Sequence, residues 1–251
     1  MTYTMDSLGS ERKLLHSLVD FSNKSVLEVG CGEGRLTWQF ADKTKYVVAI
    51  DPEAEKIAVA KKNSPKDLKN RVEFLEGTLL DYKLKKGLPK FDVVLLSWSL
   101  CCMEPEDMLP GLRKCYELLK RDGLLIDIHP FGESDYVEIH FENKIWRAGR
   151  TIDKSNYLSY QQADHALENV IEQDVLIPQS ECAFPILNTY DSMVEFEDWI
   201  AENWNDTSID SQTRDKARRL AKEIGSESHV VVREKISIAS LRPNENYFYR
   251  N

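Results

Sequence analysis

The sequence lacks the features that mark several large classes of protein. Its longest apolar runs, such as residues 93–96, are far too short to cross a membrane. The first residues contain no basic segment followed by an apolar core, so they do not predict a signal peptide. The chain has no G-x-S-x-G nucleophile elbow, no H-E-x-x-H zinc motif and no P-loop lysine. We therefore expect a cytoplasmic protein without a membrane span.

Cysteines are also few, and basic residues are outnumbered by acidic ones. The five cysteines are an odd number, Cys101 and Cys102 are adjacent, and no two cysteines form a C-x-x-C pair. This pattern argues against a disulfide framework and a zinc site, so we expect reduced thiols and no metal. The 33 basic residues are outnumbered by 42 acidic ones, which gives a net charge of −9. Because an acidic surface repels phosphate, we expect a small-molecule partner and no nucleic acid.

The 251 residues, 42 % hydrophobic and 30 % charged, suit one α/β domain with an added cap. Up to residue 130, strand-like and helix-like segments alternate, a rhythm typical of a parallel sheet with right-handed crossovers. The expected strands are residues 25–29, 46–50, 71–75, 91–97 and 124–128, and the expected helices are residues 10–20, 35–42, 53–62 and 105–120. Later in the chain we expect a hairpin at residues 137–147, a helix at residues 156–171 and either a strand pair or one bent strand at residues 175–187. Two helices, one from residue 192 and one at residues 210–224, and a strand at residues 230–241 should follow.

A glycine-rich turn follows the first expected strand, with the sequence Glu28-Val29-Gly30-Cys31-Gly32-Glu33-Gly34. Glycines let the backbone turn sharply and let a ligand approach where a Cβ atom would collide. The pattern is E-x-G-x-G-x-G, whereas a dinucleotide site has G-x-G-x-x-G and would need a glycine in place of Arg35. The acidic Glu28 suits a ligand with an ammonium group better than one with a phosphate.

This turn resembles the first motif of class I methyltransferases that depend on S-adenosylmethionine (SAM), and the resemblance covers residues 25–130 well. It implies an α/β fold: a doubly wound, Rossmann-like, seven-stranded and mostly parallel sheet with helices on both faces. Residues 1–251 would form a single domain, with residues 131–205 as a cap that selects the methyl acceptor and residues 230–241 as an antiparallel last strand. The resemblance also implies that the turn wraps the methionine part of SAM through Gly30, Cys31, Gly32 and Gly34, while Glu28 holds its amino group.

Asp51 ends the second expected strand, directly before Pro52. A carboxylate at the tip of this strand can accept two hydrogen bonds from a ribose diol. The alternative is a plain turn residue, but the nearby glycine turn favours the ribose role, so we expect Asp51 and Pro52 to be cofactor-binding residues.

Two more loops complete the expected cofactor site. In the resembled family the loop with Thr78 and Leu79 flanks the adenine, although Thr78 stands where an aspartate is frequent, and Leu79 could equally be a core residue. The loop with Ser97 and Trp98 would pass the methionine end of the cofactor, or Trp98 could pack under the following helix. Both loops follow strands, at the sheet edge where open α/β sheets bind ligands.

His129 follows the fifth expected strand, where it could act as a general base for an oxygen or nitrogen acceptor. A lone histidine before a proline is more often structural, and both interpretations stay open. Three functions compete: a SAM-dependent methyltransferase acting on a small molecule, an NAD(P)-dependent oxidoreductase on a similar sheet, and a non-catalytic SAM-binding partner subunit. Arg35 argues against the second function, and the intact Glu28 and Asp51 argue against the third.

Overall fold

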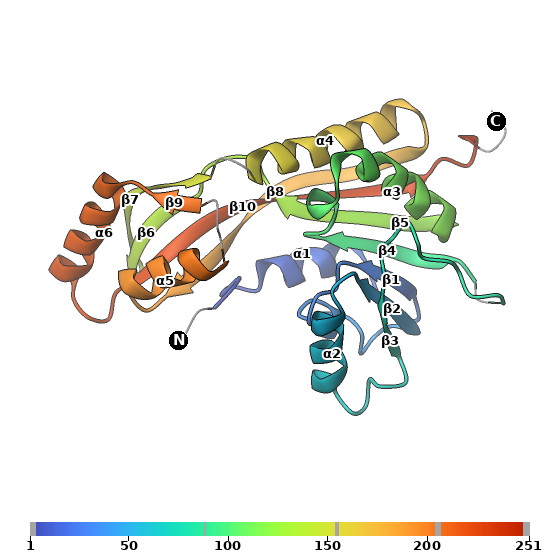
Figure 1. Cartoon of the computed structure of the whole chain (residues 1–251), viewed down its shortest axis with the longest axis horizontal. Helices are drawn as coiled ribbons and strands as arrows, with labels where there is room; N and C mark the ends of the chain where they lie inside the picture. Colours follow the sequence, from blue (N-terminus) through green and yellow to red (C-terminus); the bar gives the residue numbers. More distant parts are fainter. Residues whose placement is uncertain (1–3, 88, 154–155, 204–206, 248–251) are drawn as a thin grey trace. The chain divides into compact units, whose positions relative to one another are not determined.

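The computed structural model describes residues 4–87, 89–153, 156–203 and 207–247 (Figure 1). The chain divides into two compact units, which we describe separately. The core unit comprises Leu14–His129, Gln162–Cys182 and Ser237–Asn251, and the appended unit comprises Met1–Lys13, Pro130–Gln161 and Ala183–Ile236. No helix in the described part of the chain is both long and apolar enough to cross a membrane.

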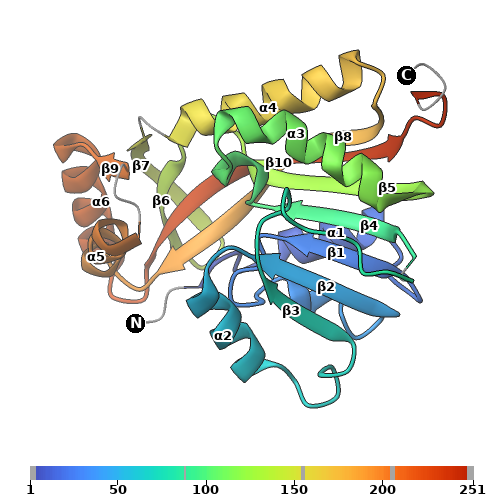
Figure 2. The same ribbon diagram turned by 45° about the vertical axis from the view of Figure 1, so that its right-hand side comes forward.

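The core unit is built on a parallel sheet with the strand order β3-β2-β1-β4-β5 (Figure 2). Its strands are β1 (Ser25–Val29), β2 (Tyr46–Asp51), β3 (Val72–Glu76), β4 (Phe91–Ser97) and β5 (Leu119–Pro130). Its helices include α2 (Ala54–Asn63), which contacts β2 and β3, and α3 (Pro105–Leu118), which contacts β4. All residues of β1 are buried, as expected of a central strand covered on both faces. The predicted Rossmann-like architecture is confirmed, but the predicted number of seven strands is wrong, because the described part of the chain forms ten strands.

Two predicted boundaries in the core unit are wrong. The helix expected at residues 35–42 is reduced to a single 3₁₀ turn, η1 (Thr37–Gln39). Two of its aromatic side chains are anchored, Trp38 against Phe74 and Phe40 stacked on Phe21, and aromatic residues are weak helix formers. The strand expected at residues 124–128 is longer and begins at Leu119, with a register shift against β4.

The appended unit contains an antiparallel sheet in which β10 (His229–Pro243) pairs with β6 (Tyr136–Phe141), β6 with β7 (Lys144–Asp153), and β7 with β9 (Thr207–Ile209). The predicted hairpin over residues 137–147 is thus confirmed. Residues from the sheet and from α5 (Met193–Asn203) and α6 (Ser211–Ile224) form one hydrophobic core. The remaining elements of the chain are α1 (Ser10–Leu18), the 3₁₀ helix η2 (Leu100–Cys102), α4 (Asn156–Glu172) and β8 (Leu176–Tyr190).

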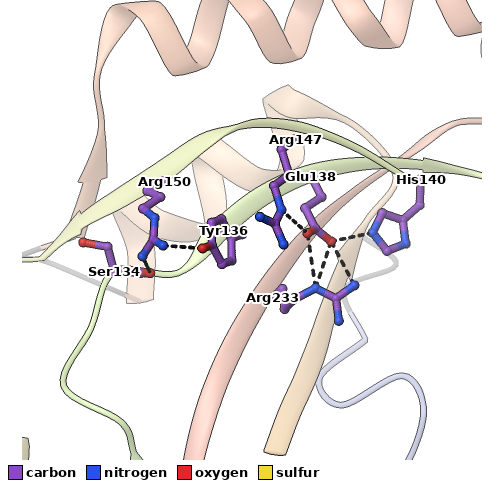
Figure 3. A network of polar contacts seen from close by, with 7 residues as sticks. All are labelled: Ser134, Tyr136, Glu138, His140, Arg147, Arg150 and Arg233. Atoms are coloured by element: carbon purple, nitrogen blue, oxygen red, sulfur yellow. Dashed lines mark hydrogen bonds and ion pairs between the residues drawn. The ribbon is translucent and has the colours of Figure 1, made fainter. Parts of the chain in front are cut away.

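The buried carboxylate Glu138 lies on β6 (Figure 3). Because side chains alternate along a strand, it faces away from the hydrophobic core residues Val137 and Ile139. Glu138 accepts hydrogen bonds from Nε of Arg233 at 3.1 and 3.2 Å and lies 2.8 Å from Nε2 of His140. Burial raises the pKa of Glu138, but these bonds outweigh burial and the pKa is lowered. The carboxylate therefore stays charged within a satisfied network.

Gly149 of β7 provides the close approach of α6 to the sheet. A Cβ atom at this position would lie 2.0 Å from Oγ1 of Thr213. We expect Gly149→Ala to lower the free energy of unfolding by about 1–3 kcal/mol, the usual cost of overpacking, in a urea titration. A second substitution, Thr213→Ala, should recover part of the loss because it removes the two nearest atoms. A Gly149→Ala variant as stable as the wild type would contradict this packing.

Candidate active site

A pocket of about 480 Å³ opens at the carboxyl ends of β1 to β4 in the core unit. Its volume lies in the range of pockets that hold small molecules and cofactors. Eight of the predicted site residues line it: Gly30, Gly32, Asp51, Pro52, Thr78, Leu79, Ser97 and Trp98. In the described part of the chain, Glu28, Cys31, Gly34 and His129 are not among the lining residues.

The glycines of the turn after β1 serve different purposes. Gly30, at φ +74°, packs against the loop after β4, since an added Cβ atom would lie 2.5 Å from the Cβ atom of Ser99. Gly34 has no room for a side chain, because an added Cβ atom would lie 2.9 Å from the indole ring of Trp38. Gly32, at φ +53°, faces open space, because nothing lies within 4 Å of an added Cβ atom. Gly32 therefore leaves room for a ligand, whereas the other two leave room for the protein itself.

Asp51 connects the tips of β1 and β2. Its Oδ2 accepts a hydrogen bond from the backbone N–H of Gly32 at 2.8 Å, and its Oδ1 accepts one from Glu53 at 2.9 Å. The side chain is buried but lines the pocket. Each carboxylate oxygen has two lone pairs, so each can accept one further bond from a ligand.

Glu28 lies beneath the turn, where it is buried. Its Oε2 accepts a hydrogen bond from the hydroxyl of Thr37 at 2.5 Å. This bond connects β1 to η1, the two elements that flank the glycine turn. A contact between Glu28 and an amino group of the ligand stays a prediction.

The loop after β3 forms one wall of the pocket. The Thr78 hydroxyl donates to Oδ2 of Asp81 at 2.7 Å and accepts from the Asp81 backbone N–H at 3.2 Å. Leu79 is buried and presents an apolar surface beside this small turn. The wall thus combines an apolar side chain with a rigid backbone, which suits a flat aromatic group.

The loop after β4 forms the opposite wall. Trp98 adopts φ +57°, unusual for a bulky residue, and its N–H donates to the Ile128 carbonyl at 2.7 Å. Such strain is often found at ligand sites. The buried hydroxyl of Ser99, which also lines the pocket, has no hydrogen-bond partner in the described part of the chain. A buried polar atom facing a pocket in this way is available to a ligand.

Sequence reasoning missed several lining residues that follow β2 and β4: Glu53, Lys56, Cys102, Met103, Glu104 and Asp107. A search of the first turns after each strand would have found most of them. Together with Asp51 they bring four carboxylates and one ammonium group to the pocket. This lining favours a ligand that carries positive charge.

His129 lies between two carboxylates instead of facing the pocket. Its Nδ1 is 2.5 Å from Oδ2 of Asp127, and its Nε2 is 3.1 Å from Oδ1 of Asp164 on α4. Burial lowers the pKa of His129, but the charge of Asp127 and the hydrogen bonds to both aspartates outweigh burial and raise the pKa to about 10. A histidine protonated at neutral pH cannot act as a general base, so the geometry supports the structural interpretation.

This arrangement predicts a pH dependence of stability. Because the pKa of His129 rises from its ordinary 6.5 to about 10 on folding, its stabilising effect is complete below pH 6.5 and is lost as the pH approaches 10. We expect the wild type to lose roughly 2–4 kcal/mol more than His129→Gln between pH 6 and pH 10 in urea unfolding. Equal pH dependence of the two proteins would contradict the assignment.

The sequence of this chain is similar to those of known methyltransferases. Residues 26–123 match the family described as "Methyltransferase domain". The chain is 26 % identical over 151 residues to a demethylmenaquinone methyltransferase of Lactococcus lactis, covering 57 % of this chain and 58 % of that one. It is 27 % identical over 127 residues to a tRNA N(3)-methylcytidine methyltransferase of Schizosaccharomyces pombe, covering 48 % and 40 %. The chain thus spans about half the length of these curated relatives.

A solved structure shows the same fold. The N-methyltransferase NodS from Bradyrhizobium japonicum, in complex with S-adenosylhomocysteine (SAH), superimposes with a TM-score of 0.55. The match is 13 % identical and covers 96 % of this chain and 88 % of that one. Residues 26–123 are thus similar in sequence to a methyltransferase domain, and the likeness to NodS shows that the chain has the same fold.

Proposed function

We propose that the chain transfers the methyl group of SAM to a small-molecule acceptor, with SAM bound in the pocket of the core unit. The proposal depends on the adjacent positions of Gly32 and Asp51. Gly32 faces open space in the pocket, and the carboxylate of Asp51, which accepts its N–H, has further lone pairs for a ligand. Asp51 would accept the ribose hydroxyls, and the turn of Gly30 and Gly32 would wrap the methionine part. The acidic lining suits the positive charge of a sulfonium.

The other predicted residues take supporting roles in this proposal. Leu79 and the backbone at Thr78 would flank the adenine, and Pro52 would shape the ribose wall. Ser97 and Trp98 would lie beside the methionine end, Glu28 would hold its amino group, and Cys31 would belong to the turn that wraps it. When bound, SAM supplies an activated methyl group, and the protein aligns the acceptor with it and excludes water. This demand for alignment is compatible with a site that has no dedicated base.

The acidic pocket and the net charge of −9 support a small molecule over a nucleic acid as acceptor. The similarity to a demethylmenaquinone methyltransferase supports the same choice, and the similarity to a tRNA methyltransferase supports the alternative. The acceptor would be selected by the residues outside the matched domain, for which residues 131–205 remain our prediction. Residues 1–251 acting as one domain is likewise a prediction.

The proposal is tested by following a labelled methyl group from SAM. The full chain is incubated with a panel of phenols, quinols and amines and, separately, with tRNA, with Gly32→Val as the blank. We expect transfer to at least one small molecule and none in the blank. Transfer to tRNA alone would overturn the acceptor class. Binding of SAM without transfer to any acceptor would instead favour a non-catalytic partner subunit.

A further inference from the structure

Two adjacent cysteines differ sharply in their surroundings. Cys101 and Cys102 end the 3₁₀ turn η2, between β4 and α3. Cys101 is buried, whereas Cys102 is exposed and lines the pocket. The same pocket contains Asp51, Lys56 and the unpartnered hydroxyl of Ser99. Cys102 thus offers a thiol to any small reagent that enters the proposed SAM site.

The environment of Cys102 favours its reactive form. A hydrogen bond from Cys101 lowers the pKa of Cys102, burial and Asp51 oppose this, Lys56 assists it, and the pKa is lowered to about 7. In contrast, the same contact and burial raise the pKa of Cys101. The thiolate is the nucleophile in thiol chemistry, so Cys102 is the sulfur of the pair that attacks a reagent. Cys101 remains a protonated thiol next to it.

We propose that Cys102 is a site of oxidation by peroxides, that Cys101 resolves the oxidised sulfur to a disulfide, and that this modification closes the pocket to SAM. The proposal rests on the proposed function, because it requires SAM to occupy this pocket. It follows from the placement of a reactive thiol and its neighbour in a turn whose flanking residues, Ser99 and Met103, also line the pocket.

The chemistry balances in two steps. The Cys102 thiolate attacks one oxygen of hydrogen peroxide, an S–O bond forms, the O–O bond breaks, and the released hydroxide takes a proton to become water. The sulfur is oxidised to a sulfenic acid and the peroxide is reduced. The Cys101 sulfur then attacks that of Cys102, an S–S bond forms, the S–O bond breaks, and the hydroxyl leaves as a second water with the Cys101 proton.

Geometry explains why the disulfide would alter the pocket. Adjacent Cα atoms are about 3.8 Å apart, less than the roughly 4.4 Å lower limit usual for a disulfide. Closing the ring between Cys101 and Cys102 therefore requires the turn to change its backbone. That change moves Ser99, Cys102 and Met103, which are wall residues of the proposed SAM site. A strained disulfide of this kind is also readily reduced, which makes the modification reversible.

The test treats the reduced full-length protein with hydrogen peroxide, with and without SAH. Alkylation followed by peptide mass spectrometry locates the modified cysteines. Exposed Cys182 serves as the internal reference. We expect a Cys101–Cys102 disulfide, seen as a loss of two hydrogen masses. At pH 7 it should form about threefold or more faster than Cys182 is oxidised. The larger thiolate fraction of Cys102 speeds its reaction, and the lower nucleophilicity of a low-pKa thiol offsets part of that gain. SAH should slow the modification of Cys102 but not that of Cys182.

Calorimetry then measures SAH affinity before oxidation, after it, and after reduction with dithiothreitol. We expect at least a tenfold loss on oxidation and full recovery on reduction. Each variant is compared with its own reduced form: Cys102→Ser and Cys101→Ser should show no disulfide, whereas Cys182→Ser should behave as the wild type. Unprotected Cys102, or unchanged SAH affinity in the oxidised protein, would overturn the inference. A reduced wild type that does not bind SAH would instead refute the proposed function.

Discussion

Gly32→Val is expected to abolish cofactor binding, with a loss of SAH affinity of roughly 100-fold or more in calorimetric titration. The position faces open space in the pocket, so the two added methyl groups would occupy the volume proposed for the methionine part of SAM. The backbone at φ +53° adds strain for a β-branched residue. The N–H that Gly32 donates to Asp51 would also be disturbed by any shift of the turn.

Gly9→Val is the control that distinguishes filling of the pocket from backbone strain at a positive φ angle. Gly9 has φ +61°, and an added Cβ atom there also meets nothing within 4 Å, but Gly9 does not line the pocket. Both variants should lose similar stability, whereas only Gly32→Val should lose SAH binding. A folded Gly32→Val protein with normal affinity would refute the assignment of the turn to the cofactor.

Asp51→Ala is expected to weaken SAH binding by about 1.5–3 kcal/mol, or about 10- to 150-fold. This range is the usual cost of losing a hydrogen bond to a charged group, here the expected bond between Asp51 and the ribose. The structure adds that Asp51 anchors the backbone N–H groups of Gly32 and Glu53, so its removal loosens two lining segments as well. Asp51→Asn keeps one acceptor oxygen, and we expect a smaller loss for it.

Asp20→Ala is the matched control. Oδ1 of Asp20 accepts a hydrogen bond from the N–H of Ser22, two residues on, as Oδ1 of Asp51 does from Glu53, but Asp20 does not line the pocket. Its substitution should leave SAH affinity within about twofold. If the two alanine variants bound SAH equally well, the ribose would have to be held elsewhere.

The parallel sheet could be anticipated from the sequence because strand-like and helix-like segments alternate up to residue 130. Glycine spacing also indicated the position of the ligand. It could not show that Gly30 makes room for Ser99 and Gly34 for Trp38, whereas Gly32, alone among the three, leaves open space. Trp38 lies in η1 and Ser99 follows β4, so neither contact can be seen in the turn itself. That distinction depends on tertiary packing.

Two other features were beyond sequence reasoning for the same reason. His129 acquires its second partner, Asp164, from α4, which lies 35 residues further along the chain. Nothing local to His129 indicates that carboxylate. Glu104 and Asp107 resemble ordinary acidic residues at a helix start, where they complement the helix dipole. Only the folded chain shows that they also line the pocket.

The most direct test of the central claim is calorimetric titration of the full chain with SAH and, in parallel, with NAD. The E-x-G-x-G-x-G turn, the open space at Gly32 and the free lone pairs of Asp51 predict saturable binding of one SAH per chain and no binding of NAD. Binding of NAD without binding of SAH would contradict the account and restore the oxidoreductase alternative.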